Sequence, residues 1–175
     1  LMLGIDPTTI DVVANGWVAA ILGRVLEAAA KAFGWTPKPG PSGRGVGVAL
    51  GTDAGTYCAN MAEVNVDKAT GSIRVVRLLA AQDMGMVVNP EGAIQQMEGC
   101  LTMGMGYALT EDVHFKNGEV LDTNFDTYQL PRFSWLPKLD TILLDSDLPP
   151  QGGGEPAIVQ MGAVLANAVF DAVGA

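Results

Sequence analysis

The chain has 175 residues, of which 49% are hydrophobic and 17% charged, and its formal net charge is −9. A chain with this many hydrophobic residues can bury a core, which argues against a disordered protein. The sequence has no cluster of basic residues, which argues against a nucleic-acid-binding protein. Cys58 and Cys100 lack the CxxC spacing of metal and iron–sulfur sites, so we interpret them as buried thiols.

The first elements expected along the chain are a helix and an irregular loop. Residues 1–7 lack the features of a signal peptide, and no apolar run reaches the ~18 residues of a membrane span. Apolar residues then recur at helical spacing over residues 11–33, and Gly34 is a plausible stop. The proline-rich stretch 36–43 predicts a loop. We therefore divide the chain into a helical lead-in, residues 1–35, and a main unit, residues 36–175.

Three strands and a glycine-rich helix are expected next. Residues 45–50, 57–66 and 73–81 show strand patterns, and the polar turn at 67–72 predicts that the last two pair as an antiparallel hairpin. Asn89 followed by Pro90 is typical of a helix start, so we expect a helix to about Leu109. Its four glycines lower helix stability and favour close packing against a ligand or another backbone.

The C-terminal half predicts a hairpin, one more strand and a final helix. The Asn117-Gly118 pair is a strong turn signal between two short strands, 112–115 and 119–121. Residues 122–138 should be irregular, 139–144 a strand, 145–154 a loop and 156–173 an apolar helix. Because turns rather than crossovers join the strand pairs, we expect an α+β fold with a mixed or antiparallel sheet packed with helices.

The segment 151–157 is the most informative for chemistry. Its three glycines allow the backbone to approach a bulky cofactor, and a helix that starts directly after them would face the same place with its free N–H groups. A carboxylate there, Glu155, could serve as a general base. A flexible loop with a first-turn acid is the simpler alternative.

A second candidate site lies on the expected glycine-rich helix. Gln96, Gly99 and Met103 share one face, and a glutamine amide can both donate to and accept from a pterin or nucleotide edge. We interpret the methionines on this helix and in the loop before it as core residues rather than ligands: Met84, Met86, Met97, Met103 and Met105. His114, the only histidine, is interpreted as structural, and the Gly-Arg-Gly-Val-Gly run at 43–47 is only a weak match to a phosphate loop.

Together these segments resemble the C-terminal part of the molybdopterin-binding large subunit of the xanthine dehydrogenase and aldehyde oxidase superfamily. The isoquinoline 1-oxidoreductase and aldehyde dehydrogenase branch is the most similar. The segments that carry the resemblance, in order, are residues 43–49, 62–67, 88–90, 96–99, 154–157 and 167–174.

The resemblance implies a molybdenum hydroxylase that oxidises aldehydes or N-heterocycles with water as the oxygen source. Glu155 matches the family's catalytic base, which takes a proton from the molybdenum-bound hydroxyl. Gln96, Gly153 and Gly154 match residues beside the cofactor, for which a cytosine dinucleotide form is expected. A small [2Fe-2S] subunit and the rest of the large subunit are the implied partners, with a small-molecule substrate, no nucleic acid and no metal ligand from this chain.

Two other interpretations stay open at the level of sequence. The chain could be a non-catalytic interaction module that keeps the fold, or a glycine-loop nucleotide binder. Complete subunits of the family are several times longer, so we expect the isolated chain to be inactive. The compartment, cytoplasmic or periplasmic, is left open.

Overall fold

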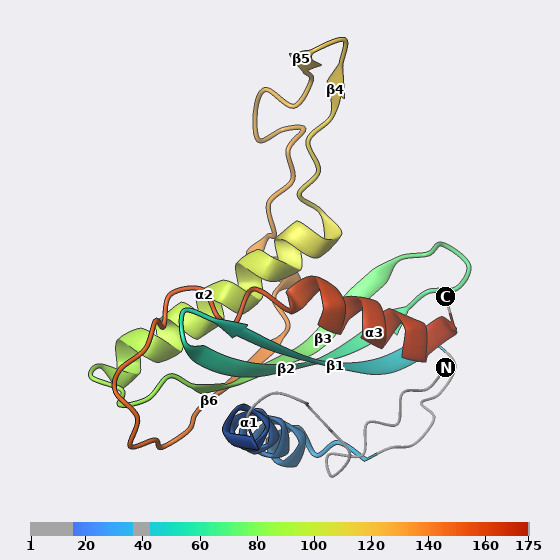
Figure 1. The fold of residues 1–175 in the computed structure, drawn as a ribbon. Coiled ribbons are helices and arrows are strands. Elements are labelled where there is room, and N and C mark those ends of the chain that lie inside the picture. Colours follow the sequence, from blue (N-terminus) through green and yellow to red (C-terminus); the bar gives the residue numbers. More distant parts are fainter. Residues whose placement is uncertain (1–15, 37–42, 175) are drawn as a thin grey trace.

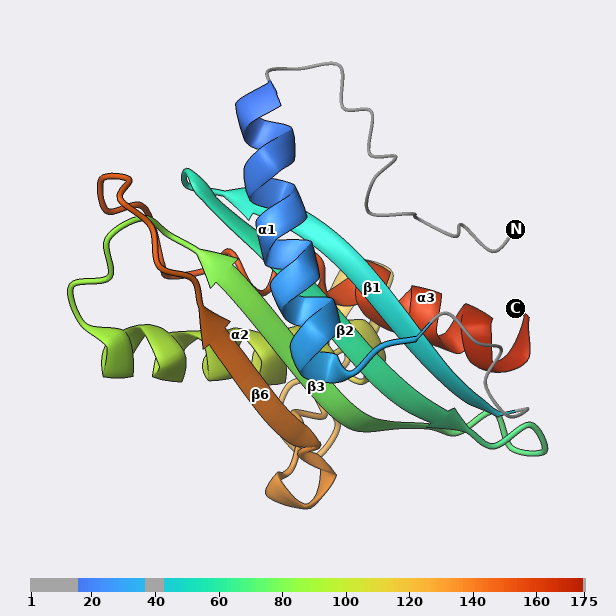
Figure 2. The same ribbon diagram turned by 90° about the horizontal axis from the view of Figure 1, so that it is seen from below.

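A four-stranded sheet with helices on both faces organises the molecule. The computed structural model describes residues 16–36 and 43–174. The strand order in the sheet is β1-β2-β3-β6. Helix α1 (Gly16–Phe33) covers one face, and α2 (Pro90–Leu109) and α3 (Met161–Val173) lie on the other (Figures 1 and 2). This arrangement confirms the expected α+β class with a mixed sheet.

The first three strands form an antiparallel meander, and the fourth runs parallel to its neighbour. Strands β1 (Arg44–Asp53), β2 (Thr56–Val66) and β3 (Ile73–Asp83) pair in sequence. Strand β6 (Lys138–Leu143) pairs with β3 in parallel, from Arg77 to Gln82. The four strands predicted at 45–50, 57–66, 73–81 and 139–144 are therefore confirmed. β1 is longer than expected, because residues 54 and 55, both at positive φ, close a tight turn directly onto β2.

Two apolar clusters hold the helices to the sheet. Under α1, Val25 and Ala29 pack against the outer side chains of β2 and β3. The larger cluster joins the opposite face of the sheet to α2 and α3. The predicted turn of helix at 11–15 and most of the loop, 37–42, lie outside the described residues.

The start of α2 is set by its own sequence. The side chain of Asn89 accepts a hydrogen bond from the backbone N–H of Gly92 at 3.1 Å, and Pro90 occupies the first helical position. Met97 and Met105 are buried as expected, but Met86 and Met103 are more than half exposed, so the core interpretation was wrong for these two.

The start of α3 differs from the prediction. The helix begins at Met161, and residues 156–160 form turns instead of its first turn. Tertiary contacts explain the delay: the carbonyl of Ala157 accepts a hydrogen bond at 2.7 Å from the buried side chain of Asn60 on β2. The free N–H groups of α3 therefore do not lie directly after the glycines, and the expectation based on them was wrong.

The glycines near the start of β1 serve packing. A Cβ at Gly45 would lie 2.1 Å from the carbonyl oxygen of Ala168, and one at Gly47 would lie 2.0 Å from that of Val164. The backbones of β1 and α3 approach so closely that only glycine fits between them. The run at 43–47 is thus part of a strand under a helix and not a phosphate loop.

Between α2 and β6 the chain leaves the body as an arm, residues 111–136. It projects from the end of α2 and returns to the start of β6 (Figure 1). Its tip is the predicted hairpin, β4 (Phe115–Lys116) and β5 (Glu119–Val120), with Asn117 and Gly118 at positive φ in the turn. A short 3-10 helix, η1 (Phe133–Trp135), precedes β6. None of the helices within the described ranges is long and apolar enough to cross a membrane.

Candidate functional site

The glycine loop, residues 151–155, is fixed to two neighbouring turns. The N–H of Gln151 donates to the carbonyl of Met84 at 2.9 Å, just beyond β3. The N–H of Gly152 donates to the carbonyl of Ala54 at 3.0 Å, and its own carbonyl accepts from the hydroxyl of Thr56 at 2.6 Å. The backbone of the loop is therefore hydrogen-bonded to both neighbouring turns at the end of the sheet.

A third attachment joins the glycine loop to α2. The side-chain amide of Gln96 donates to the carbonyl of Gly154 at 2.6 Å, and the thiol of Cys100, one turn later, lies 3.2 Å from the same oxygen. Glu155 follows directly and is exposed. The structure thus brings Gln96, Gly153, Gly154 and Glu155 together, although their positions are about 60 residues apart in sequence.

The three glycines of the loop are not equivalent. A Cβ at Gly152 would lie 2.5 Å from the Cβ of Ala54, and a Cβ at Gly153 would lie 2.4 Å from the Cε of Met84. These two glycines are explained by packing within the chain. A Cβ at Gly154 would meet no atom within 4 Å. The missing side chain of Gly154 therefore leaves open space beside Glu155.

The glycines of α2 also include one that is needed for packing and one that is not. Gly104 packs against Met161, and a Cβ there would lie 2.5 Å from its Cγ. Gly99 lies one turn beyond Gln96, and no atom lies within 4 Å of the place its Cβ would take. A glycine inside a helix costs about 1 kcal/mol relative to alanine, so one without a packing reason is unusual. Gly99 thus joins the candidate site, and the spacing of Gln96 and Gly99 in the sequence was the signal for it.

Glu155 lies close enough to Cys100 for its charge to act on the thiol. Burial raises the pKa of Cys100, and the negative charge of Glu155 raises it further. Hydrogen bonds from the backbone N–H groups of Ala157 and Ile158 lower it, which shows that these amides face the sulfur. Glu155 is exposed, and no described residue forms an ion pair or hydrogen bond with its carboxylate.

Sequence reasoning missed the residues that support the loop from below. Asn60 is fully buried, and besides its bond to Ala157 its side-chain oxygen accepts from the thiol of Cys58 at 3.3 Å. Burial raises the pKa of Cys58 to about 12, so this thiol is inert. The available signal was a polar residue among the small apolar residues of β2, at 58–62. Asn60 connects the sheet to the backbone directly after Glu155.

His114 lies on the arm and not at the glycine loop. Its ring contacts the carboxylate of Asp122 at 2.8 Å, and its backbone N–H donates to the same carboxylate. The hydrogen bond and charge of Asp122 raise the pKa of His114. Within residues 16–36 and 43–174 no group of three or more His, Cys, Asp or Glu side chains could hold a metal ion.

Two polar side chains of α3, Asn167 and Asp171, hold this helix against β1. The side-chain amide of Asn167 donates to the carbonyl of Val48 at 2.9 Å. The carboxylate of Asp171 accepts from the N–H of Val46 at the same distance. These two residues therefore have a structural role, and they hold the helix that follows the glycine loop.

Comparison with known proteins identifies the family. The model of the molybdopterin cofactor-binding domain matches residues 3–137. The chain belongs to this family. The match includes Gln96 but ends before the glycine loop.

Individual relatives align with a larger share of the chain than the family model does. The membrane-bound aldehyde dehydrogenase of Gluconacetobacter polyoxogenes, named for pyrroloquinoline quinone, is 34% identical over 89% of the chain and 20% of its own length. Isoquinoline 1-oxidoreductase subunit beta of Brevundimonas diminuta is 29% identical over 82% of the chain and 19% of its own length. These matches confirm the resemblance drawn from the sequence, including the isoquinoline branch.

The fold is shared with solved molybdenum enzymes. The CO dehydrogenase of Oligotropha carboxidovorans superposes with a TM-score of 0.62 at 27% identity, over 67% of this chain and 15% of that one. The chain therefore spans about a fifth or less of the relatives that it matches.

Proposed function

We propose that the chain forms part of the cofactor-binding site of a molybdenum hydroxylase, in which Glu155 is the catalytic base. The observation that carries the proposal is the attachment of the glycine loop to α2 through Gln96 and Gly154. It holds an exposed carboxylate, an amide side chain and two glycines with open space around them on one side of the molecule.

The residues present fit a bulky planar cofactor. Gly99 and Gly154 leave room for a close approach, and neither glycine is explained by packing within the described chain. The side-chain oxygen of Gln96 accepts no hydrogen bond within the described part of the chain, so it can receive one from a pterin edge. We assign Gln96, Gly153 and Gly154 to cofactor contacts; Gly153 also allows the loop to pass Met84.

The molybdenum cofactor, when bound, supplies a Lewis acid and an electron acceptor. Glu155 then acts as general base: one carboxylate oxygen accepts the proton of the oxygen nucleophile, derived from water, that attacks the substrate carbon. Hydrogen bonds from Gln96 to Gly154 and from Asn60 to Ala157 hold the backbone on both sides of Glu155. The position from which the carboxylate extends is therefore restrained. Such positioning is what a general base needs.

Substrate, nucleotide form and partner follow from the relatives as further proposals. Two relatives are named for aldehydes and isoquinoline, so we propose an aldehyde or an N-heterocycle as substrate. We propose the cytosine dinucleotide form of the cofactor, which release of cytidine monophosphate on acid treatment of the assembled enzyme would test. The two cysteines of these 175 residues are both buried and cannot supply the four thiolates of an iron–sulfur cluster, so we propose that electrons leave through a cluster outside this region, on a [2Fe-2S] subunit.

The decisive test replaces Glu155 in the enzyme assembled with the remaining part of the large subunit. Glu155→Gln keeps the size and shape of the side chain but removes the base, so turnover should fall by about 10²–10⁴-fold. Molybdenum content should stay near that of the unchanged enzyme. The matched control is Glu119→Gln, the same change at an exposed position on the tip of the arm. Unchanged turnover in Glu155→Gln would refute the assignment.

Metal analysis of the same assembly tests the cofactor independently. We expect molybdenum and an organic pterin, and loss of both when Gly154 is replaced by a bulky residue such as valine. Pyrroloquinoline quinone without molybdenum would instead favour the cofactor for which the Gluconacetobacter relative is named. Neither cofactor, in a folded assembly, would favour a non-catalytic module.

A further inference from the structure

Strand β3 has a free edge beside the start of β6. The ladder between the two strands runs from Arg77 to Gln82, but β3 itself begins four residues earlier, at Ile73. On the other side, β2 pairs with β3 from Ile73 to Asp83, with a register shift at Glu63 and Val64 that leaves Val76 without a partner. Residues 73–76 therefore have no neighbouring strand on the β6 side within the described chain, and β3 is seen to extend past the start of β6 (Figure 2).

The chain cannot fill this edge with its own β6. Pro137, directly before β6, has no N–H to donate to the ladder, and it disfavours helical backbone at Leu136 before it. The backbone turns away at this point into η1 (Phe133–Trp135). The four-residue edge is thus left open by a specific feature of the sequence. Open edges are a liability that folded proteins usually cover.

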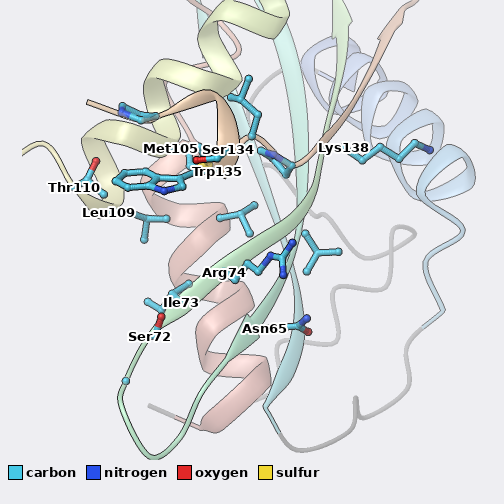
Figure 3. A pocket seen from close by; sticks show the side chains of 16 residues that line it. Asn65, Ser72, Ile73, Arg74, Met105, Leu109, Thr110, Ser134, Trp135 and Lys138 are labelled. Carbon is cyan, nitrogen blue, oxygen red and sulfur yellow. The ribbon is translucent and has the colours of Figure 1, made fainter. Parts of the chain in front are cut away.

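A cavity of about 900 Å³ lies along the free edge. Its floor is β3, and its wall is formed by the C-terminal end of α2 together with residues 131–137 (Figure 3). We call it the edge groove. The apolar side chains that line it include Ile73, Val75, Met105, Leu109, Trp135 and Leu136.

One side of the edge groove is apolar and the other is basic. Val75 belongs to the cluster shared with α2 and α3, and Ile73 packs against the same cluster. Arg74, between them, points to the opposite face of the strand and is exposed. The groove also contains Lys138 but no acidic residue, although the chain carries a net charge of −9. Lys138 is paired with Asp140, whereas Arg74 forms no ion pair with any described residue.

We propose that the edge groove binds an extended polypeptide segment that adds to the sheet beside residues 73–76, in line with β6. Only a polypeptide backbone offers donors and acceptors at the spacing that a strand edge requires. The segment alternates apolar and acidic side chains. Its apolar side chains lie against Met105, Leu109 and Trp135, and an acidic one lies across from Arg74.

The length and source of the segment follow from the same observations. Four residues of strand span about 13 Å, so a segment of four to six residues covers the edge. The relatives place at least four fifths of their length outside the region that this chain matches, and we assign the segment to that part of the large subunit. The inference rests on the free strand edge and the charges of the groove, not on the role of Glu155.

The test uses the 175-residue chain and a dye-labelled, capped hexapeptide in which valine alternates with glutamate. Binding is followed by fluorescence anisotropy. Arg74→Glu should weaken binding by about tenfold, because it converts an attraction into a repulsion. Lys116→Glu, the same change of charge on the arm, should leave the affinity unchanged. A peptide with lysine in place of glutamate, and one with alternate backbone N-methyl groups, should not bind measurably.

Hydrogen exchange locates the bound peptide. We expect backbone N–H groups within residues 73–76 to gain protection when the glutamate peptide is added, while those from Arg77 to Gln82 change little because β6 already pairs there. No binding of the glutamate peptide, equal binding of the N-methylated peptide, or protection elsewhere would each overturn the proposal. Equal binding of the N-methylated peptide would identify the groove as an apolar pocket rather than a site of strand addition.

Discussion

The contact between β1 and α3 allows a sharp prediction, because Gly47 separates their backbones. In Gly47→Ala the new Cβ would lie 2.0 Å from the carbonyl oxygen of Val164 and 2.5 Å from the N–H nitrogen of Ala168. Both atoms are backbone, so no rotamer change relieves the overlap. Helix α3 must move away from β1 by about 1 Å or more to restore ordinary contact.

The movement has a cost that follows from the contacts it strains. Overpacking alone costs about 1–3 kcal/mol. The hydrogen bond from Asn167 to Val48 is worth about 0.5–1.5 kcal/mol, and that from Val46 to the carboxylate of Asp171 about 1.5–3 kcal/mol. If both hydrogen bonds are lost, the free energy of unfolding should fall by about 3–7.5 kcal/mol, out of a typical total of about 5–15 kcal/mol.

Urea unfolding followed by circular dichroism at 222 nm measures the effect. The midpoint of Gly47→Ala should lie more than about 1 M below that of the unchanged chain. Gly23→Ala is the matched control, because Gly23 lies inside α1 and its Cβ would meet no atom within 4 Å. That change should stabilise the chain by about 0.5–1 kcal/mol. A midpoint for Gly47→Ala within about 0.3 M of the unchanged chain would refute the packing argument.

Three further predictions address other parts of the molecule. Because Asp122 raises the pKa of His114, the ion pair between them is fully formed below about pH 6.5 and is lost as the pH rises through the raised pKa. In Asp122→Asn the pKa of His114 should return toward 6.5, which NMR titration of the ring measures. An unchanged pKa in this variant would contradict the contact. Cys58, whose pKa burial raises to about 12, should resist a thiol reagent at pH 8 until the chain unfolds, and rapid reaction of the folded chain would be inconsistent with its burial. Leu101 is fully buried on α2, and Leu101→Ala leaves a cavity there that should lower the free energy of unfolding in urea by about 2–5 kcal/mol. A loss of less than about 1 kcal/mol would argue against a close-packed core.

Local signals predicted most of the elements correctly. Asn89 and Pro90 mark the start of α2, and Asn117-Gly118 marks the hairpin of the arm, because capping and positive φ depend on the residues themselves. The start of α3 could not be predicted in this way. Asn60, about 100 residues earlier, holds Ala157 in a turn and delays the helix to Met161.

The candidate site was only partly visible in the sequence. Glu155 and Gln96 stood out by residue type and by resemblance, yet nothing local indicates that Gln96 donates to Gly154. The glycines looked alike in sequence, and only the neighbours of each missing side chain separate Gly153, which packs on Met84, from Gly154, which faces open space.

The sequence by itself determined the family, the α+β class and the order of helices and strands, because periodicity, capping and turn chemistry act over a few residues. Only the tertiary structure decided that β6 runs parallel to β3 and leaves residues 73–76 uncovered, and which glycines serve packing. Strand pairing and the approach of two backbones depend on atoms far apart in the chain, so no short stretch of residues contains them.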